Sequence, residues 1–445
     1  MKMKYLAIFV LLGIGVVPVS AQSVRMTLEG RLTVKPELDP AQNFAGFHVL
    51  VAYRAQESAQ VDTLGFAVTD AEGKFSMPIQ AAEKGIYPVL ISRRGQQVAK
   101  GEMIVSEGDT ARLDTSLPTA LLRINSRENA AWLALRNILA QHKQNLVEIV
   151  SKGQQNGGDV KSAIALTANL LWDLEGAFGA NPVGVQLAKL ESVMMLLGWN
   201  DSLAVARSKS ITPEISGYVD LQRNLRRANA RVYGQEAAIA SLRSAIAHVP
   251  EAERQAPLYA EIVMARLDSL QAPQAMEVLH EMKQKFPSGK WASFITNAEY
   301  EAQYMMPGMP APDFNVTTID QQTFKLSGMR GQYALVEFWS PRDSVYPQQL
   351  SQVMEVVRLA NEKKVTWISI ALEPDRSVFE TFRRNREMPP LQVLEAEGTK
   401  SPVSKAYNVN YVPVRYLIGP DGKIVGKYLA NGLGRLADDL NNKIK

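Results

Sequence analysis

The chain has 445 residues, of which 46% are hydrophobic and 21% are charged, and its formal net charge is +4. This composition predicts a globular protein of two to four domains. The charge is too small to indicate a nucleic-acid partner, and basic pairs such as Arg93–Arg94 are expected to be solvated. The chain contains no cysteine, which excludes thiol catalysis, disulfides and thiolate metal sites.

Residues 1–21 have the pattern of a secretory signal peptide. Lys2 and Lys4 precede an apolar run over residues 5–17, whose 13 residues are fewer than the about 20 that a membrane-spanning helix needs. Pro18 ends the run, and small residues up to Ala21 predict cleavage after that residue. We therefore expect a periplasmic or secreted protein with no transmembrane or lipid anchor.

Residues 22–117 are predicted to form a β-sandwich. Residues 24–30 alternate apolar and polar side chains, and further short strands are expected at 48–53, 63–68, 73–79 and 87–92. Asp70 and Gly73 supply a turn before Phe75, which is a hairpin signal. Many short strands without a helical pattern favour two packed sheets.

Residues 118–305 are predicted to be helical. Ser126 is a candidate cap for a helix that Gly153 ends, and further helices are expected to begin at Pro182 and Pro213. The apolar face of the first helix is predicted to comprise Leu135, Ile138, Leu139, Leu146, Ile149 and Val150.

A short repeat lies in this helical region. The residues at positions 238, 242, 245 and 250 recur in kind at 275, 279, 282 and 287, a period of 37 residues. The pattern resembles a degenerate tetratricopeptide pair, although such arrays usually need about three copies. It is consistent with a helical spacer or with a groove that binds a partner.

Residues 306–312 (MPGMPAP) are predicted to be a proline-rich linker, followed by an α/β domain over residues 313–445. Strands are expected at 333–339, 365–372, 411–418 and 423–429. Helices are expected at 347–363, at about 375–386 and from about Leu433. Alternating strands and helices indicate a mixed α/β fold.

Four segments of this last region resemble the thioredoxin-like thiol-disulfide reductases of the bacterial envelope, the TlpA- and ResA-like group. They are residues 310–314 (PAPDF), 329–339 (MRGQYALVEFW), 407–413 (YNVNYVP) and 419–425 (GPDGKIV). The hairpin signal at residues 70–75 resembles the N-terminal β-sandwich of exported members from Bacteroidetes-type bacteria. The resemblance implies a multidomain chain: a β-sandwich, a central all-α region and a C-terminal thioredoxin-like fold.

The same resemblance shows where the family's chemistry has been lost. When the segments are aligned from Trp339, the positions of the family's cysteine pair fall on Asp343 and Tyr346. Neither a carboxylate nor a phenol can form a mixed disulfide. Asp343 is expected to cap a helix or to act as a catalytic or ligand-binding carboxylate. Glu337 falls on the family's buried acid, and is expected to be a hydrogen-bonded relic or an acid in a cleft.

The resemblance also implies a surface for an extended peptide. Pro413 is expected to be cis, and the backbone of Val412 is expected to pair with the peptide. Trp339, Tyr346 and Tyr411 are expected either to line the same groove or to pack in the ordinary way. The predicted binding residues are thus Trp339, Tyr411, Val412 and Pro413.

The leading hypothesis is a redox-inactive envelope protein that binds peptides or proteins, or serves as a scaffold. One alternative is a member of the oxidoreductase family that acts only with a partner's thiols. The other is an enzyme of another class that uses Glu337 and Asp343 as acid–base carboxylates. Neither a metal nor a cofactor is expected, because the sequence has no metal-binding histidine spacing, nucleophile elbow or phosphate loop.

Overall fold

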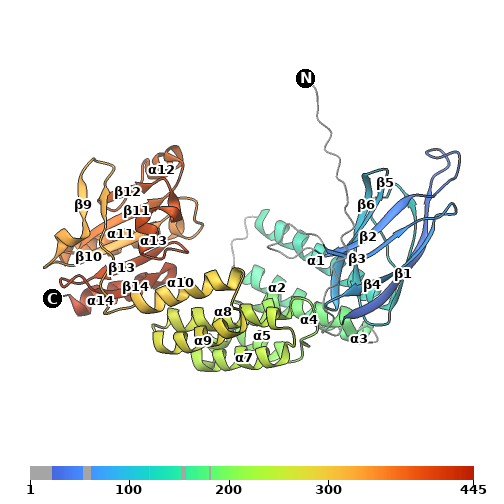
Figure 1. Ribbon diagram of the computed structural model, residues 1–445, viewed down its shortest axis with the longest axis horizontal. Helices are drawn as coiled ribbons and strands as arrows, with labels where there is room; N and C mark the ends of the chain where they lie inside the picture. The colour runs from blue at the N-terminus through green and yellow to red at the C-terminus, as the bar shows by residue number, and fades with distance from the viewer. Residues whose placement is uncertain (1–22, 54–61, 120, 152–156, 180–181, 445) are drawn as a thin grey trace, which may run out of the picture. The chain divides into compact units, whose positions relative to one another are not determined.

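The computed structural model describes residues 23–53, 62–119, 121–151, 157–179 and 182–444 (Figure 1). The predicted signal peptide over residues 1–21 lies outside them. The chain divides into two compact units, Met1–Leu258 and Tyr259–Lys445. No helix among the described residues is long and apolar enough to cross a membrane.

The first unit begins with a β-sandwich of two sheets, drawn in blue in Figure 1. Their strand orders are β4-β1-β7 and β3-β2-β5-β6. Alternate residues face the core, as in β4, where Phe75, Met77 and Ile79 are buried and their neighbours are exposed. The predicted β-sandwich is confirmed. The strands are β1 (Val24–Val34), β2 (Phe47–Tyr53), β3 (Asp62–Val68), β4 (Lys74–Ala81), β5 (Gly85–Arg93), β6 (Gln96–Val105) and β7 (Thr110–Leu117).

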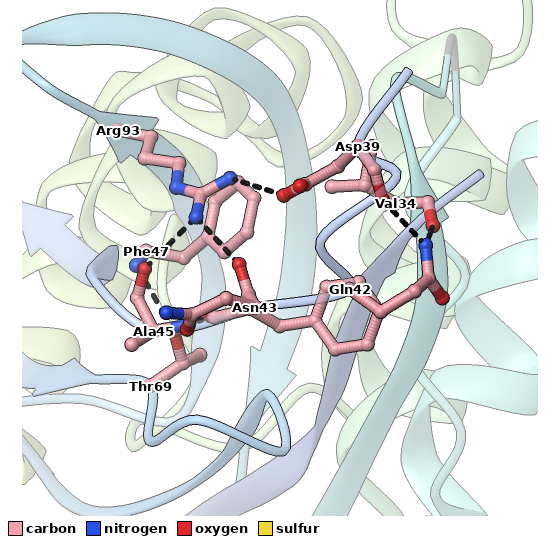
Figure 2. Close-up of polar contacts among 9 residues, drawn as sticks. Val34, Asp39, Gln42, Asn43, Ala45, Phe47, Thr69 and Arg93 are labelled. Carbon is pink, nitrogen blue, oxygen red and sulfur yellow. Dashed lines mark hydrogen bonds and ion pairs between the residues drawn. The ribbon is translucent and has the colours of Figure 1, made fainter. Parts of the chain in front are cut away.

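Arg93 holds the connection between β1 and β2, as Figure 2 shows. Its guanidinium donates to the carbonyls of Asn43 at 2.7 Å and Ala45 at 3.2 Å, and pairs with Asp39 at 3.4 Å. It also lies 4.4 Å from the centre of the Phe47 ring. The expectation of a solvated pair therefore holds for Arg94, which is exposed, but not fully for Arg93, whose donors satisfy loop carbonyls.

Helices follow the sandwich. Ser126 caps the first of them, since its Oγ accepts the Asn129 N–H at 3.2 Å. Of the six residues predicted for its apolar face, Leu135 alone is buried, and Val150 is 72% exposed. The helices are α1 (Arg127–Ser151), α2 (Gly157–Trp172), α3 (Leu174–Phe178), α4 (Pro182–Leu196), α5 (Asp201–Ser208), α6 (Tyr218–Tyr233) and α7 (Gln235–His248).

Of the helix starts predicted at Pro182 and Pro213, the first is confirmed and the second is wrong. α4 begins at Pro182 as expected. The segment after Pro213 forms turns instead, and α6 begins five residues later, where Gly217 takes a φ of +88°.

The first three positions of each copy of the short repeat are buried in two helices of equal length, whereas Pro250 and Pro287 are exposed beyond the helix ends. Ala238, Leu242 and Ala245 are buried in α7, and their counterparts Ala275, Leu279 and Met282 are buried in α9 (Ala272–Lys285). α8 (Ala252–Asp268) separates them, and α10 (Lys290–Tyr304) follows. Whether these helices bind a partner remains a prediction.

The second unit contains a five-stranded sheet of order β12-β11-β10-β13-β14. β10 pairs in parallel with β11 and antiparallel with β13. All six residues of β10 are buried, because packed side chains cover both faces of the sheet. The elements are β8 (Asn315–Thr317), β9 (Thr323–Lys325), β10 (Ala334–Trp339), α11 (Tyr346–Glu362), β11 (Thr366–Leu372), α12 (Arg376–Arg383), β12 (Leu391–Glu395), α13 (Pro402–Ala406), β13 (Val414–Ile418), β14 (Ile424–Leu429) and α14 (Leu433–Lys443).

Residues 306–312, predicted to be a linker, are instead held against the closing hairpin. The N–H of Gly308 donates to the Ile424 carbonyl at 2.7 Å, and the N–H of Ala311 donates to the Gly422 carbonyl at 3.0 Å. The preceding Met305 is fully buried in the core of the α/β domain. The segment thus contacts the hairpin through turns and one bridge between Pro310 and Lys423, and α10 belongs to the same unit as the α/β domain.

Candidate functional site

Glu337 lies in the middle of β10, completely buried. The strand registers place Arg415 of β13 on one side of it and Ser369 of β11 on the other. The Arg415 Nε donates to one carboxylate oxygen at 2.8 Å, and the Ser369 hydroxyl donates to the other at 2.8 Å. The side chains of Glu337 and Arg415 are both 0% exposed, so the acid is neutralised by an equally buried cation.

Two aromatic donors complete the shell around Glu337. The Tyr346 hydroxyl and the Trp367 Nε1 each donate to Oε2 at 3.2 Å. Burial first, and the Glu337 charge second, raise the pKa of Tyr346 well above its usual value, so its hydroxyl stays protonated and donates. Of the two alternatives for Glu337, the structure shows the buried, hydrogen-bonded acid, since its side chain is 0% exposed and does not face a cleft.

Tyr346 stacks on Trp339 within the core. The two ring centres are 4.4 Å apart at an angle of 19°, and both side chains are 0% exposed. Phe379 and Phe382 of α12 pack against Trp339 as well. The structure therefore places Trp339 and Tyr346 inside the domain, where no peptide can reach them. This is the packing alternative, and the prediction that Trp339 is a binding residue is wrong.

Asp343 caps α11. Its Oδ1 accepts the backbone N–H of Val345 at 2.8 Å and of Tyr346 at 2.9 Å. These N–H groups open the helix, where no intrahelical partner exists. The capping alternative for Asp343 is thus the one that the structure shows.

Sequence reasoning missed Glu373, which ties together the loops after β10 and β11. Its buried carboxylate accepts from the Arg342 Nε at 2.8 Å and from the Asp375 N–H at 2.9 Å. An acidic residue directly after a buried strand run was the signal that could have revealed this contact.

The segment before β13 presents free backbone. The Val412–Pro413 bond is cis, as expected, and Pro413 is buried while Val412 is half-buried. Within the part of the chain that the structure describes, neither the N–H nor the C=O of Val412 has a hydrogen-bond partner. Tyr411 beside it is 36% exposed.

The site offers no metal centre. No group of three or more histidine, aspartate or glutamate side chains among the described residues is arranged to hold an ion. Both oxygens of Glu337 are hydrogen-bonded within the protein, whereas the backbone N–H and C=O of Val412 have no partner among the described residues.

Replacing Asp343 by alanine is expected to destabilise the start of α11 by about 0.5–2 kcal/mol, because two N–H groups lose their acceptor. Asp343→Asn keeps an acceptor oxygen and is the matched control. Hydrogen exchange at Val345 and Tyr346 measures the difference. Equal protection in the two variants would show that the cap contributes nothing.

The comparisons with known proteins concern the C-terminal part of the chain. Residues 307–427 match the AhpC/TSA family. A thiol-disulfide oxidoreductase ResA from Bacillus cereus is 24% identical over 129 residues, which are 29% of this chain and 73% of that protein.

Solved structures give similar matches. The thioredoxin domain of a thiol-disulfide oxidoreductase from Bacteroides vulgatus is 20% identical, with a TM-score of 0.29, and the match covers 31% of this chain and 98% of that one. A thiol-disulfide oxidoreductase from Bacteroides fragilis is 26% identical, with a TM-score of 0.26, over 29% of this chain and 98% of that one. The C-terminal part of this chain is thus a thioredoxin-like domain of the AhpC/TSA family, in a protein that has no cysteine.

Proposed function

We propose that this protein is a redox-inactive, thioredoxin-like module that holds an extended segment of a partner protein at the backbone of Val412. The observation that carries the proposal is that the N–H and C=O of Val412 have no hydrogen-bond partner among the described residues. The nearby Glu337 network is buried, and the chain has no thiol. An extended peptide that pairs there gains main-chain hydrogen bonds without any covalent step.

The alternative of acid–base catalysis has little support. Both oxygens of Glu337 accept hydrogen bonds inside the core, and Oδ1 of Asp343 accepts the N–H groups of Val345 and Tyr346. A general acid or base must reach the proton that it transfers, and Glu337 is 0% exposed.

Action with a partner's thiols stays a second candidate, favoured by the similarity to proteins named thiol-disulfide oxidoreductases. In that case the segment held at Val412 carries a cysteine, but no covalent adduct with this chain can form. Export to the bacterial envelope, suggested by residues 1–21, is part of the same proposal.

The redox arm of the test is an insulin-reduction assay with dithiothreitol. The purified protein is expected to give the rate of the buffer blank, because it has no sulfur nucleophile. A rate clearly above the blank contradicts the proposal.

The binding arm compares Val412→Pro with Val412→Ala. Proline removes the N–H and is expected to weaken binding of an extended peptide about tenfold, whereas alanine keeps the N–H and is expected to bind like the wild type. Peptides selected from a random phage-displayed library serve as the probe, and circular dichroism confirms folding. Equal loss in both variants would point to the side chain and against strand pairing.

A further inference from the structure

A pocket of about 260 Å³ lies within the second unit, next to the segment before Pro413. Its wall comes from α8 and α10 on one side, and from β14 and the loop over residues 408–411 on the other. Tyr411, the neighbour of Val412, lines it. The pocket is therefore lined by the residue next to Val412, so a side chain of a peptide paired there has a pocket close by.

Polar contacts fix α10 against the thioredoxin-like domain and so define the pocket. The Tyr300 hydroxyl donates to the Ala406 carbonyl at 3.0 Å. The Asn408 amide donates at 3.0 Å both to the Asn297 carbonyl and to the Glu301 carboxylate. These contacts join α10 to α13 and to the loop before Val412, so the pocket is built into the unit.

The lining of the pocket includes an ion pair whose two charges neutralise each other. Glu301 pairs with Lys427 of β14, and both side chains are 8% exposed. The Lys427 ammonium also lies 5.5 Å from the ring centres of Tyr411 and Tyr416. The charged lining groups are two acidic, Asp268 and Glu301, and two basic, Lys427 and Arg435, so their charges sum to zero (2 − 2). A charged occupant would gain no net attraction there.

The rest of the lining is mainly apolar: Met264, Leu267, Phe294, Ala298 and Leu429 contribute, together with the Tyr411 ring. The volume of 260 Å³ is below the roughly 300–1,000 Å³ of sites for whole small molecules. It suits one large side chain better than a cofactor. Deep apolar pockets that receive a single anchor residue commonly dominate peptide and protein binding.

We propose that this pocket takes one large uncharged apolar side chain, aliphatic or aromatic, from the extended peptide that pairs with Val412. The inference rests on the proposed function and adds the chemical class of the peptide. Hydrogen bonds to the peptide main chain contribute affinity for any peptide sequence, whereas the pocket favours peptides that carry a suitable side chain. The helices α8 and α10 thus give the thioredoxin-like domain a selectivity that its sheet alone does not have.

The test uses the full chain and the peptides selected from a random phage-displayed library. Selected peptides are expected to share one large apolar residue, and its replacement by alanine is expected to weaken binding about tenfold or more. Ala298→Leu adds side-chain volume to the pocket and is expected to remove this preference. Ser293→Leu introduces the same side chain at an exposed position of the same helix and is the matched control.

Phe294→Ala provides a second variant, in case Ala298→Leu disturbs α10. It enlarges the pocket and is expected to shift the preference towards a larger side chain. If peptides bind, depend on the Val412 N–H and yet respond alike to Ala298→Leu and Ser293→Leu, the pocket proposal is overturned while the proposed function stands. If no peptide is selected at all, both are overturned.

Discussion

Replacing Arg415 by methionine is expected to destabilise the thioredoxin-like domain by about 3–5 kcal/mol, because it leaves the Glu337 charge buried without its cation. Both side chains are 0% exposed, and the Arg415 Nε lies 2.8 Å from Oε1. The remaining hydrogen bonds to the carboxylate come from neutral groups, Ser369, Tyr346 and Trp367. These donors stabilise the charge less than a paired guanidinium does.

The double variant Glu337→Met, Arg415→Met is the informative control. The Nη1 and Nη2 atoms of Arg415 are buried without a hydrogen-bond partner among the described residues, so the pair itself is imperfectly satisfied. Apolar replacement of both partners is therefore expected to recover most of the loss. Urea unfolding of the full chain, followed by hydrogen exchange in β10 and β13, measures each variant. A single variant as stable as the wild type, or a double variant no better than the single one, would contradict this interpretation.

The thioredoxin-like domain could be predicted from sequence because its signals are local. The strand over residues 334–339 is a continuous apolar run interrupted by one acid, and Pro413 and the turn over residues 419–422 stand at family spacings. The hydrogen bonds from the start of α11 to Asp343 could also be predicted, since a short acidic side chain just before a helix lies within reach of its first N–H groups. Each of these inferences needed only neighbouring residues.

The errors concern packing between distant segments. The aromatic character of Trp339 is visible in the sequence, but its burial depends on Phe382 of α12 and on Tyr346 at the start of α11. The proline-rich segment looked like a linker because its pairing partner, Ile424, lies more than a hundred residues later. Periodicity likewise predicted an apolar face along all of α1, although the fully buried residues of this helix, such as Leu135, lie in its first part.

Replacing Tyr346 by cysteine, together with Asp343→Cys, would restore the residue types of the family's redox pair. It is expected to destabilise the domain by about 3–5 kcal/mol, because a fully buried aromatic ring is lost and a cavity remains beside Trp339. Removal of the Asp343 cap adds to the loss. The position of the second family cysteine is now part of the core, so the site cannot regain a thiol without repacking.

Tyr346→Phe separates the ring from the hydroxyl. It keeps the stack on Trp339 and removes only the hydrogen bond to Glu337, so a loss of about 0.5–1.5 kcal/mol is expected. The two variants are compared by urea unfolding and by hydrogen exchange across α11. If Tyr346→Cys with Asp343→Cys is as stable as Tyr346→Phe, the ring does not hold the core together. The absence of cysteine would then be a loss that the fold could readily reverse.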